Sequence, residues 1–129
     1  MSDRELIHTD QAPAAIGPYS QAVKAGGVLY CSGQIPLHPQ TGELVGAGDV
    51  AQQTEQVLAN LKAVIEAGGA TLGDVVRCEL FLTDMGKFQV VNEIYGKYFG
   101  ESPPARFTAE VSRLPKDVEI EIAAIVHVP

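Results

Sequence analysis

Arg106 and Glu121 are the residues of this chain whose types and positions suggest chemistry. Each lies in a stretch where polar and apolar residues alternate with the period of a half-buried strand. One well-placed arginine is sufficient to hold a small anion, because its planar guanidinium donates hydrogen bonds in a fixed geometry. The same pair is also compatible with an ordinary ion pair between strands or subunits. Both interpretations stay open from periodicity alone.

Arg106 belongs to the stretch PPARFTAEVSRLP, which runs from Pro103 to Pro115. Strand alternation divides this stretch into a polar side, with Arg106, Thr108, Glu110 and Ser112, and an opposite side, with Phe107, Ala109, Val111 and Arg113. We expect the side of Phe107 to face the core, and Glu110 and Ser112 to be structural. The polar side fits either a solvated outer face or a recess built around the arginine.

The histidines and cysteines give less indication of a functional site. His8, His38 and His127 are far apart, and none has an HxH, HxxxH or HExxH spacing, so no metal site is predicted. Cys31 and Cys78 lie in apolar, strand-like runs without a CxxC spacing. We expect both to be buried thiols that act as small hydrophobic side chains.

The composition is that of one globular domain over residues 1–129. Hydrophobic residues make up 46% of the chain, which is too many for a disordered one. No apolar run is long enough to span a bilayer, and the charged start MSDRELIHTDQ has no signal-peptide core. The expected location is the cytoplasm, without a membrane partner.

The charge balance bears on possible ligands. Nine basic residues against sixteen acidic ones give a formal charge of −7, and no cluster of Lys and Arg offsets it. Such a surface repels phosphate backbones, so nucleic acid is not an expected partner. A small anionic substrate remains compatible with this charge, because it needs only a local arginine.

Four strands and two helices are expected around these residues. The clearest helix runs from Asp49, a suitable N-cap, to the Gly68-Gly69 stop, and a second one follows from about Met85 to Phe99. Strands are expected within Gly26–Pro36, Asp74–Asp84, Pro103–Pro115 and Asp117–Val128. In the first strand, alternation groups Gly33 with Leu29 and Cys31; in the second, it groups Val76 with Cys78, Leu80 and Leu82 on the apolar face.

Each of these strands has one apolar face, suited to packing under the two helices, and one mixed face. The mixed faces carry Tyr30, Phe81, Ala123 and Ile125, which are unusual on a bare solvent-exposed surface. Because only two helices are available, a second subunit is the simplest cover for that side. We therefore predict an α+β domain that associates through its sheet.

Several blocks of sequence together resemble one known family, the YjgF/Rid proteins, or reactive intermediate deaminases. The matching blocks are AAIGPYSQAV (residues 14–23), CSGQIPLHPQTGELV, QTEQVLANLKAVIEAGGATLGDVV, FLTDM, VNEIYGKYF, PPAR and EVSRLPKDVEIEIAAI. The resemblance covers the chain from about Pro13 to Ile125. Its most specific part is PAR followed by EVxRLPK and IEI.

The resemblance implies a chorismate-mutase-like α+β fold, with a mixed sheet, two helices on one face and a homotrimer with clefts between subunits. It also implies hydrolysis of 2-imino or enamino acids, such as 2-iminobutanoate and 2-iminopropanoate, to 2-oxo acids and ammonia, without a cofactor. The family arginine falls on Arg106, as a clamp for the substrate carboxylate. The family glutamate falls on Glu121, as the base that activates water. Further cleft positions fall on Tyr19, Ser32, Gly33, Asn92 and Thr108.

Thr108 is a departure from the family pattern. Many members have Ser-Cys after the arginine, whereas this chain has Phe107-Thr108, so a cysteine nucleophile is absent at this position. The clamp and the base are retained. Two other functions remain as alternatives: a non-catalytic trimer that binds 2-oxo acids or regulates another protein, and a ribonuclease or translation inhibitor, which the charge disfavours.

Overall fold

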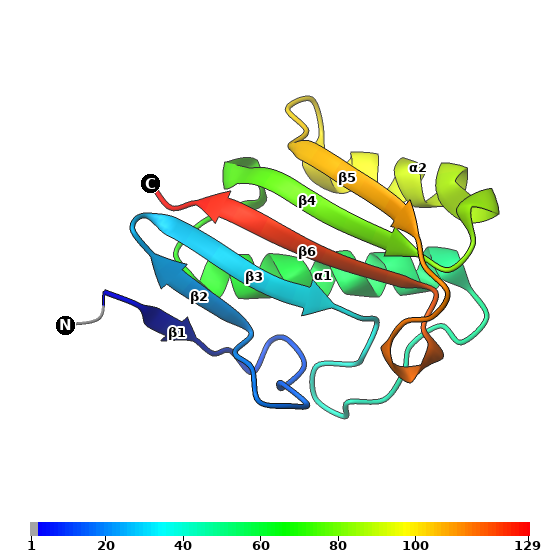
Figure 1. The fold of residues 1–129 in the computed structure, drawn as a ribbon, viewed down its shortest axis with the longest axis horizontal. Helices are drawn as coiled ribbons and strands as arrows, with labels where there is room; N and C mark the ends of the chain where they lie inside the picture. The colour runs from blue at the N-terminus through cyan, green and yellow to red at the C-terminus, as the bar shows by residue number, and fades with distance from the viewer. Residues whose placement is uncertain (1–2) are drawn as a thin grey trace.

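The computed structural model describes residues 3–129 as a six-stranded sheet with two α-helices on one face (Figure 1). This is the α+β architecture that the sequence predicts; Met1 and Ser2 lie outside the described residues. The main elements in chain order are β1 (Glu5–Ile7), β2 (Ala22–Ala25), β3 (Val28–Gln34), α1 (Val50–Ala67), β4 (Val75–Leu82), α2 (Phe88–Phe99), β5 (Ala105–Glu110) and β6 (Ile120–His127).

The strand order in the sheet is β1-β2-β3-β6-β4-β5. All neighbours pair antiparallel except β4 and β5, which are parallel because α2 carries the chain back to the start of the sheet between them. The sheet is therefore mixed, as expected. One face lies against the helices, and the other, which faces the viewer in Figure 1, has no helix of residues 3–129 packed on it. We call these the helix face and the open face.

The helices form where the periodicity predicts them. The Asp49 side chain accepts a hydrogen bond from the Gln52 backbone N–H at 3.1 Å and so caps α1. The predicted stripes are buried against the sheet, with Val50, Thr54, Val57, Leu58, Leu61 and Ile65 from α1 and Val91, Tyr95 and Phe99 from α2. Within residues 3–129, neither helix is long and apolar enough to cross a bilayer.

The predicted faces of β4 are wrong at its start. Val75, expected on the mixed face, is only 6% exposed, whereas Val76, expected in the core, is 51% exposed. The cause is a shift in the pairing with β6 between Val75 and Arg77, where β4 carries one extra residue. From Cys78 onward the alternation is regular, and Cys78, Leu80 and Leu82 are buried as expected.

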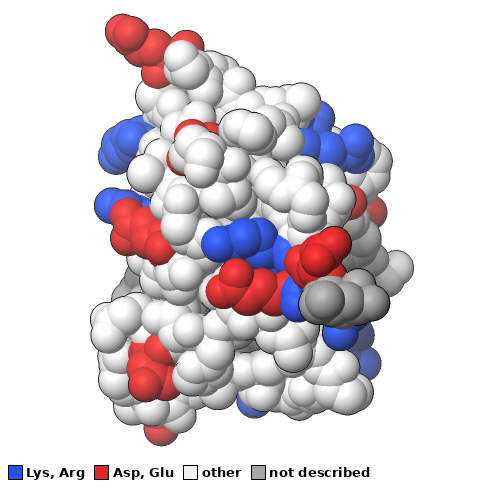
Figure 2. Space-filling view, turned by 90° about the vertical axis from the view of Figure 1, so that its left-hand side faces the viewer, with Lys and Arg blue, Asp and Glu red and all other residues white. Residues whose placement is uncertain are grey.

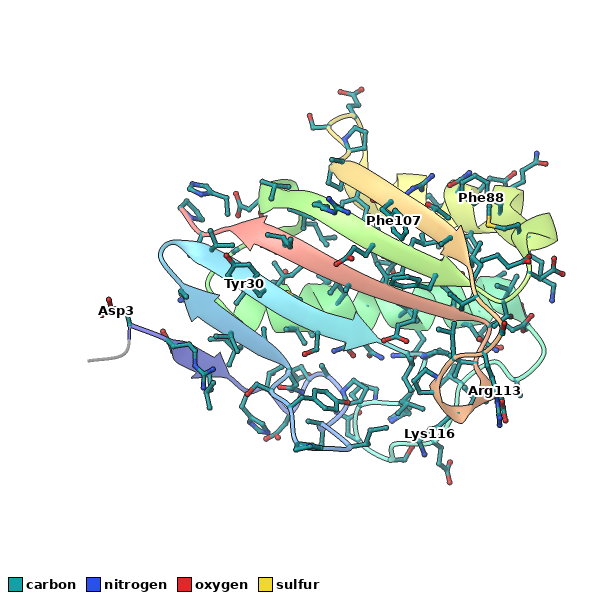
Figure 3. All side chains as sticks on the ribbon, viewed as in Figure 1. Asp3, Tyr30, Phe88, Phe107, Arg113 and Lys116 are labelled. Atoms are coloured by element: carbon teal, nitrogen blue, oxygen red, sulfur yellow. The ribbon has the colours of Figure 1, made fainter. Side chains whose placement is uncertain are left out.

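The prediction for β5 is wrong as well. Arg106 pairs with Cys78 of β4, so its side chain lies on the helix face, at the edge of the sheet. Phe107 lies instead on the open face, 44% exposed (Figure 3). The edge of its ring meets Phe81 at a centroid distance of 6.0 Å. Alternation shows which residues share a side of a strand, but at an edge the polar side can still be the one nearer the helices.

Beyond β5 the alternation no longer applies. The strand ends at Glu110, whose carboxylate accepts a hydrogen bond from the Met85 N–H at 2.8 Å, which is a structural role as predicted. Arg113, expected on the side of Phe107, is exposed in the following turn and pairs with Asp117 at 2.7 Å. Lys116 and Asp117 both have positive φ, 57° and 56°, in this turn.

Asn60 joins α1 to the chain that leaves β3. Its buried side-chain amide donates to the backbone carbonyls of Ile35, at 3.3 Å, and Leu37, at 2.9 Å. These carbonyls belong to a segment without regular strand partners, so the asparagine supplies hydrogen bonds that the sheet does not. Helix α1 thereby sets the path of the chain beside Ile35.

Replacing Asn60 with alanine removes its donors from both buried carbonyls, although the Ile35 carbonyl still accepts from the Leu37 N–H at 2.8 Å. We expect Asn60→Ala to lower the free energy of unfolding by about 1–3 kcal/mol, measured by urea denaturation. The control is Gln56→Ala, which removes one half-buried hydrogen bond to the Asn60 Oδ1 at 2.8 Å. An equal loss in both variants would contradict this account of Asn60.

Candidate functional site

A recess of about 460 Å³ opens beside the ends of β3 and β6. Four of its lining residues are positions to which the sequence analysis assigns a role: Tyr19, Ser32, Gly33 and Glu121. Ile16, Ile35 and Pro115 complete the lining. Glu121 alternates with the buried Ile120 and Ile122, which places its side chain on the open face. We call this group of seven residues the Glu121 half-site.

A bulge in β3 shapes this half-site. Cys31 pairs with Ala124 of β6 and Gln34 pairs with Ile122, so Ser32 and Gly33 together stand opposite Ala123. The bulge turns Gly33 away from the core side, where strict alternation would have grouped it with Leu29 and Cys31, and toward Glu121.

Close approach explains why residue 33 is glycine. A Cβ atom built on Gly33 would overlap the Glu121 carboxylate and lie 2.9 Å from its Cδ. The neighbouring Ser32 fixes the bulge, because its Oγ donates to the Ser20 carbonyl at 2.6 Å and its N–H donates to the Gln21 carbonyl at 3.0 Å. The carboxylate therefore lies against bare backbone.

Burial raises the pKa of the Glu121 carboxyl above its ordinary value. The physical cause is desolvation, which disfavours the charged form. None of the residues that line this recess carries a positive charge that would oppose this shift. A carboxyl whose pKa is raised in this way is suited to exchange a proton with a reacting group, as a general acid or base does.

A short loop before β2 supplies Ile16 and Tyr19 to the lining of the recess. Tyr19 donates its N–H to the Gly17 carbonyl at 2.8 Å, and its hydroxyl accepts a hydrogen bond from the Ile16 N–H at 3.3 Å. Ile16 and Tyr19 remain 56% and 49% exposed. The loop thus presents one aromatic and one aliphatic side chain beside a single carboxylate.

Arg106 lies elsewhere, on the helix face. Its Nη1 donates to the Asn92 Oδ1 at 2.8 Å, and its guanidinium carbon lies over the rings of Phe88, at 5.2 Å from the centroid, and Tyr95, at 4.8 Å. Thr108 follows two residues later on the same side, paired with Leu80. We call Phe88, Asn92, Tyr95, Arg106 and Thr108 the Arg106 half-site.

The seven assigned residues thus separate into two groups on opposite faces of one sheet. Arg106 and Glu121 do not converge within the chain, which removes one of the arrangements that the sequence left open. Sequence reasoning places Phe88 and Tyr95 on the inward stripe of α2 but gives them no part in the site. The spacing of residues 88, 92 and 95 could have linked Phe88 and Tyr95 to Asn92, because it puts all three on one side of a helix.

The two cysteines lie in the core, as predicted. Cys31 and Cys78 are both free and buried, and desolvation raises the pKa of both thiols, that of Cys31 to about 12. A thiol that stays protonated at neutral pH is a poor nucleophile. Neither cysteine lines the Glu121 half-site.

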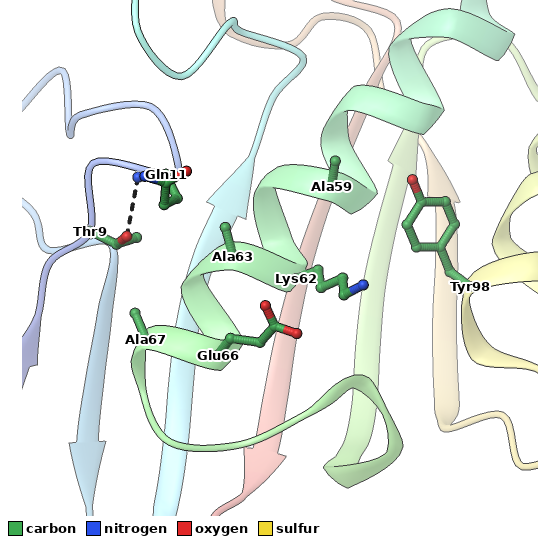
Figure 4. Close-up of a pocket in the computed structure, with 8 residues that line it drawn as sticks. All are labelled: Thr9, Gln11, Ala59, Lys62, Ala63, Glu66, Ala67 and Tyr98. Atoms are coloured by element: carbon green, nitrogen blue, oxygen red, sulfur yellow. Dashed lines mark hydrogen bonds between the residues drawn. The ribbon is translucent and has the colours of Figure 1, made fainter.

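A second hollow, of about 510 Å³, lies on the outer side of α1 (Figure 4). Ala59, Ala63 and Ala67 line its floor, with Lys62, Glu66 and Tyr98 at its sides. It contains none of the residues assigned above. On the side of the molecule shown in Figure 2, Lys and Arg side chains are interspersed with Asp and Glu rather than gathered into a basic patch.

A sequence model of the family described as Endoribonuclease L-PSP matches residues 9–128. A RutC family protein of Pyrococcus horikoshii, PH0854, is 56% identical over 124 residues, which is 96% of this chain and 98% of that protein.

Two solved structures are similar throughout. Escherichia coli TdcF with bound serine has a TM-score of 0.90 and 44% identity, covering 95% of this chain and 98% of that one. RidA from an Antarctic Psychrobacter has a TM-score of 0.92 and 44% identity, covering 96% and 99%. The residue blocks, the fold and these likenesses agree, and the chain belongs to the Endoribonuclease L-PSP family, that of the YjgF and Rid proteins.

Proposed function

We propose that this protein hydrolyses reactive 2-imino and enamino acids, such as 2-iminobutanoate and 2-iminopropanoate, to 2-oxo acids and ammonia. The observation that carries the proposal is the pairing of chemistries in the two half-sites: a desolvated carboxylate with a raised pKa, and an arginine with hydrogen-bond donors left over. The serine bound to the similar TdcF protein supports a small ligand with an amino-acid carboxylate.

We further propose that the two half-sites meet between copies of the chain, in a homotrimer. Arg106 of one copy would then face Glu121 of the next across a cleft. The open face supports this assembly, because it exposes large apolar side chains, with Tyr30 at 50%, Val76 at 51% and Phe107 at 44%. Closed rings of identical subunits use such heterologous contacts, in which two different surfaces of each copy meet.

The proposed reaction needs only water and these side chains. Arg106 binds the substrate carboxylate through two parallel hydrogen bonds and so fixes the position of the imine carbon. Glu121 takes one proton from water as the water oxygen bonds to the carbon of the protonated imine, and the electron pair of the C=N double bond moves to nitrogen to give an amine. Glu121 then returns its proton to that amine, the C–N bond breaks to release ammonia, and the carbinolamine hydroxyl gives its proton to the Glu121 carboxylate as the 2-oxo acid forms.

Glu121 acts first as base and then as acid in this sequence, for which a pKa raised above the ordinary value of a carboxyl is suited. Thr108 contributes a small polar side chain near Arg106, and no step requires a thiol. The space around the imine is lined by Tyr19 and by the bulge residues Ser32 and Gly33.

Two other functions are distinguishable from this one. A 2-oxo-acid-binding regulator would use the same clamp and recess without turnover. A ribonuclease, which the description of the matching family names, would require contact with phosphates that a formal charge of −7 disfavours. Binding of 2-oxobutanoate without imine hydrolysis would favour the first, and tight, salt-sensitive RNA binding would favour the second.

Loss of the clamp or of the base is expected to reduce imine hydrolysis to different extents. We expect Arg106→Ala to lower kcat/KM by roughly 10- to 100-fold, the value of a charge-assisted pair of hydrogen bonds, and Glu121→Gln to lower kcat by about 10²–10⁴-fold. The imine is generated in situ by an amino-acid oxidase, and its loss is followed in competition with semicarbazide. Lys62→Ala, in the hollow on α1, is the control expected to behave as wild type. An unchanged rate in Arg106→Ala would exclude the proposal.

The raised pKa of Glu121 predicts a stability effect of known sign. Between its ordinary pKa and its raised one, the folded state holds more protons than the unfolded state, so stability falls as pH rises through this window. We expect Glu121→Gln to have a higher Tm than wild type at neutral pH. The difference should vanish well below about pH 4, where the carboxyl is protonated in both states. A lower Tm for the variant at pH 7 would show that the charged form is stabilised.

A site shared between copies predicts complementation. Arg106→Ala and Glu121→Gln should each have reduced activity alone, while their co-expressed mixture exceeds the activity of either variant, because some clefts combine an intact Arg106 with an intact Glu121. Analytical ultracentrifugation should give a trimer for all three samples. The control is a mixture made after separate purification and without subunit exchange, which should have only the average activity of the two variants. Failure of the co-expressed mixture, in verified mixed trimers, would place both residues of each site in one copy.

A further inference from the structure

We infer that one side of α2, formed by Phe88, Asn92 and Tyr95, holds Arg106 in the single orientation that it needs for carboxylate binding. These three are positioning residues, which act through Arg106 rather than on the substrate. The inference rests on the proposed function, in which Arg106 is the carboxylate clamp. It assigns Phe88 and Tyr95 a part in the site, and it gives Asn92 a contact with the arginine in place of one with the substrate.

The contacts come from one stripe of one helix. Residues 88, 92 and 95 follow the i, i+4, i+7 spacing, so their side chains stand in a row beneath β5. Phe88 and Tyr95 place ring faces at 5.2 Å and 4.8 Å from the guanidinium carbon, within the range of cation–π attraction. Asn92, between them, accepts from Nη1 at 2.8 Å. Three contacts therefore converge on one cation.

The Tyr95 ring beneath the guanidinium is itself held in the core. Tyr95 is 5% exposed and packs against Phe99 with ring centroids 4.6 Å apart. It also lies close to Cys78, the buried residue with which Arg106 pairs in the sheet. A ring in such a setting has little freedom, so it transmits the rigidity of the core to the guanidinium.

Arg106 needs such support because of where it stands. It lies on β5, the edge strand, and is exposed, and a free arginine side chain retains considerable rotamer freedom that binding would have to remove. Cation–π contacts use none of its N–H groups, and Asn92 uses one at Nη1. The Nε and Nη2 donors stay available for a carboxylate, in an arrangement prepared before the substrate arrives.

The contacts of Tyr95 also indicate which part of its side chain holds Arg106. Its hydroxyl is buried and lies near the Cys78 thiol, whereas the face of its ring contacts the Arg106 guanidinium. Tyr95→Phe should therefore preserve the orientation of Arg106, and Phe88→Leu, which removes a ring from a half-buried position, should loosen it.

The first test does not depend on turnover. Nuclear magnetic resonance relaxation of the arginine Nε–H groups, assigned with Arg106→Lys, should show Arg106 as rigid in wild type and in Tyr95→Phe, and as mobile in Phe88→Leu and Asn92→Ala. The matched control is Tyr98→Leu, which removes an aromatic ring from the same helix at the hollow on α1. A rigid Arg106 in both Phe88→Leu and Asn92→Ala would overturn the inference, whether or not the protein hydrolyses imines.

The second test links the orientation to binding. We expect Phe88→Leu to raise KM for the imine, and Kd for 2-oxobutanoate by calorimetry, by roughly 3- to 30-fold, with kcat little changed. In the Arg106→Ala background the same substitution should have no further effect, since the group that it positions is gone. An equal effect in both backgrounds would mean that Phe88 acts through general packing. Absence of imine hydrolysis with normal binding and normal coupling would refute the proposed reaction and leave the positioning role supported.

Discussion

The sheet holds the Arg106 guanidinium and the Glu121 carboxylate apart, and the rest of the site depends on this separation. Pairing with Cys78 directs Arg106 to the helix face, whereas alternation with the buried Ile120 and Ile122 directs Glu121 to the open face. Had the two charges met within one chain, they would have formed an ion pair and lowered the pKa of the carboxyl. Their separation leaves the carboxyl with desolvation as the cause of its raised pKa.

In each half-site, the groups next to the charged side chain suit the sign of its charge. The carboxylate lies against the Ser32–Gly33 bulge, where the absence of a side chain on Gly33 allows close approach. The arginine lies on aromatic rings and a single amide, which favour a cation and leave donors free. A substrate with a carboxylate next to an electrophilic carbon would suit both if a second copy brought them together, which is the basis of the proposed trimer.

The apolar side chains exposed on the open face give a physical reason for copies of the chain to associate. Its exposed aromatic and aliphatic side chains lie on the same side of the sheet as Glu121, so an association that covers them would also exclude water from the recess. Removing water strengthens hydrogen bonds and charge interactions in the cleft. Stability of the assembly and chemistry of the site would then have a common origin in one surface.

Local sequence patterns were enough to predict both helices, four of the six strands and much of the core, whereas β1 and β2 were not expected. The helix from Asp49, the apolar stripes, the buried cysteines and the alternation of β6 were all predictable, because they depend on local periodicity and capping. Its blocks also identified the family, and with it seven residues of the two half-sites: Tyr19, Ser32, Gly33, Asn92, Arg106, Thr108 and Glu121.

The arrangement of those residues depends on tertiary contacts. The bulges at Val75–Arg77 and Ser32–Gly33 each add one residue to a strand, which reverses the faces that follow without leaving a mark in the apolar pattern. The side of the sheet that Arg106 occupies depends on its pairing with Cys78 and on the position of α2, both contacts between distant parts of the chain. Period-two alternation reports which residues share a side, and long-range packing decides what that side faces.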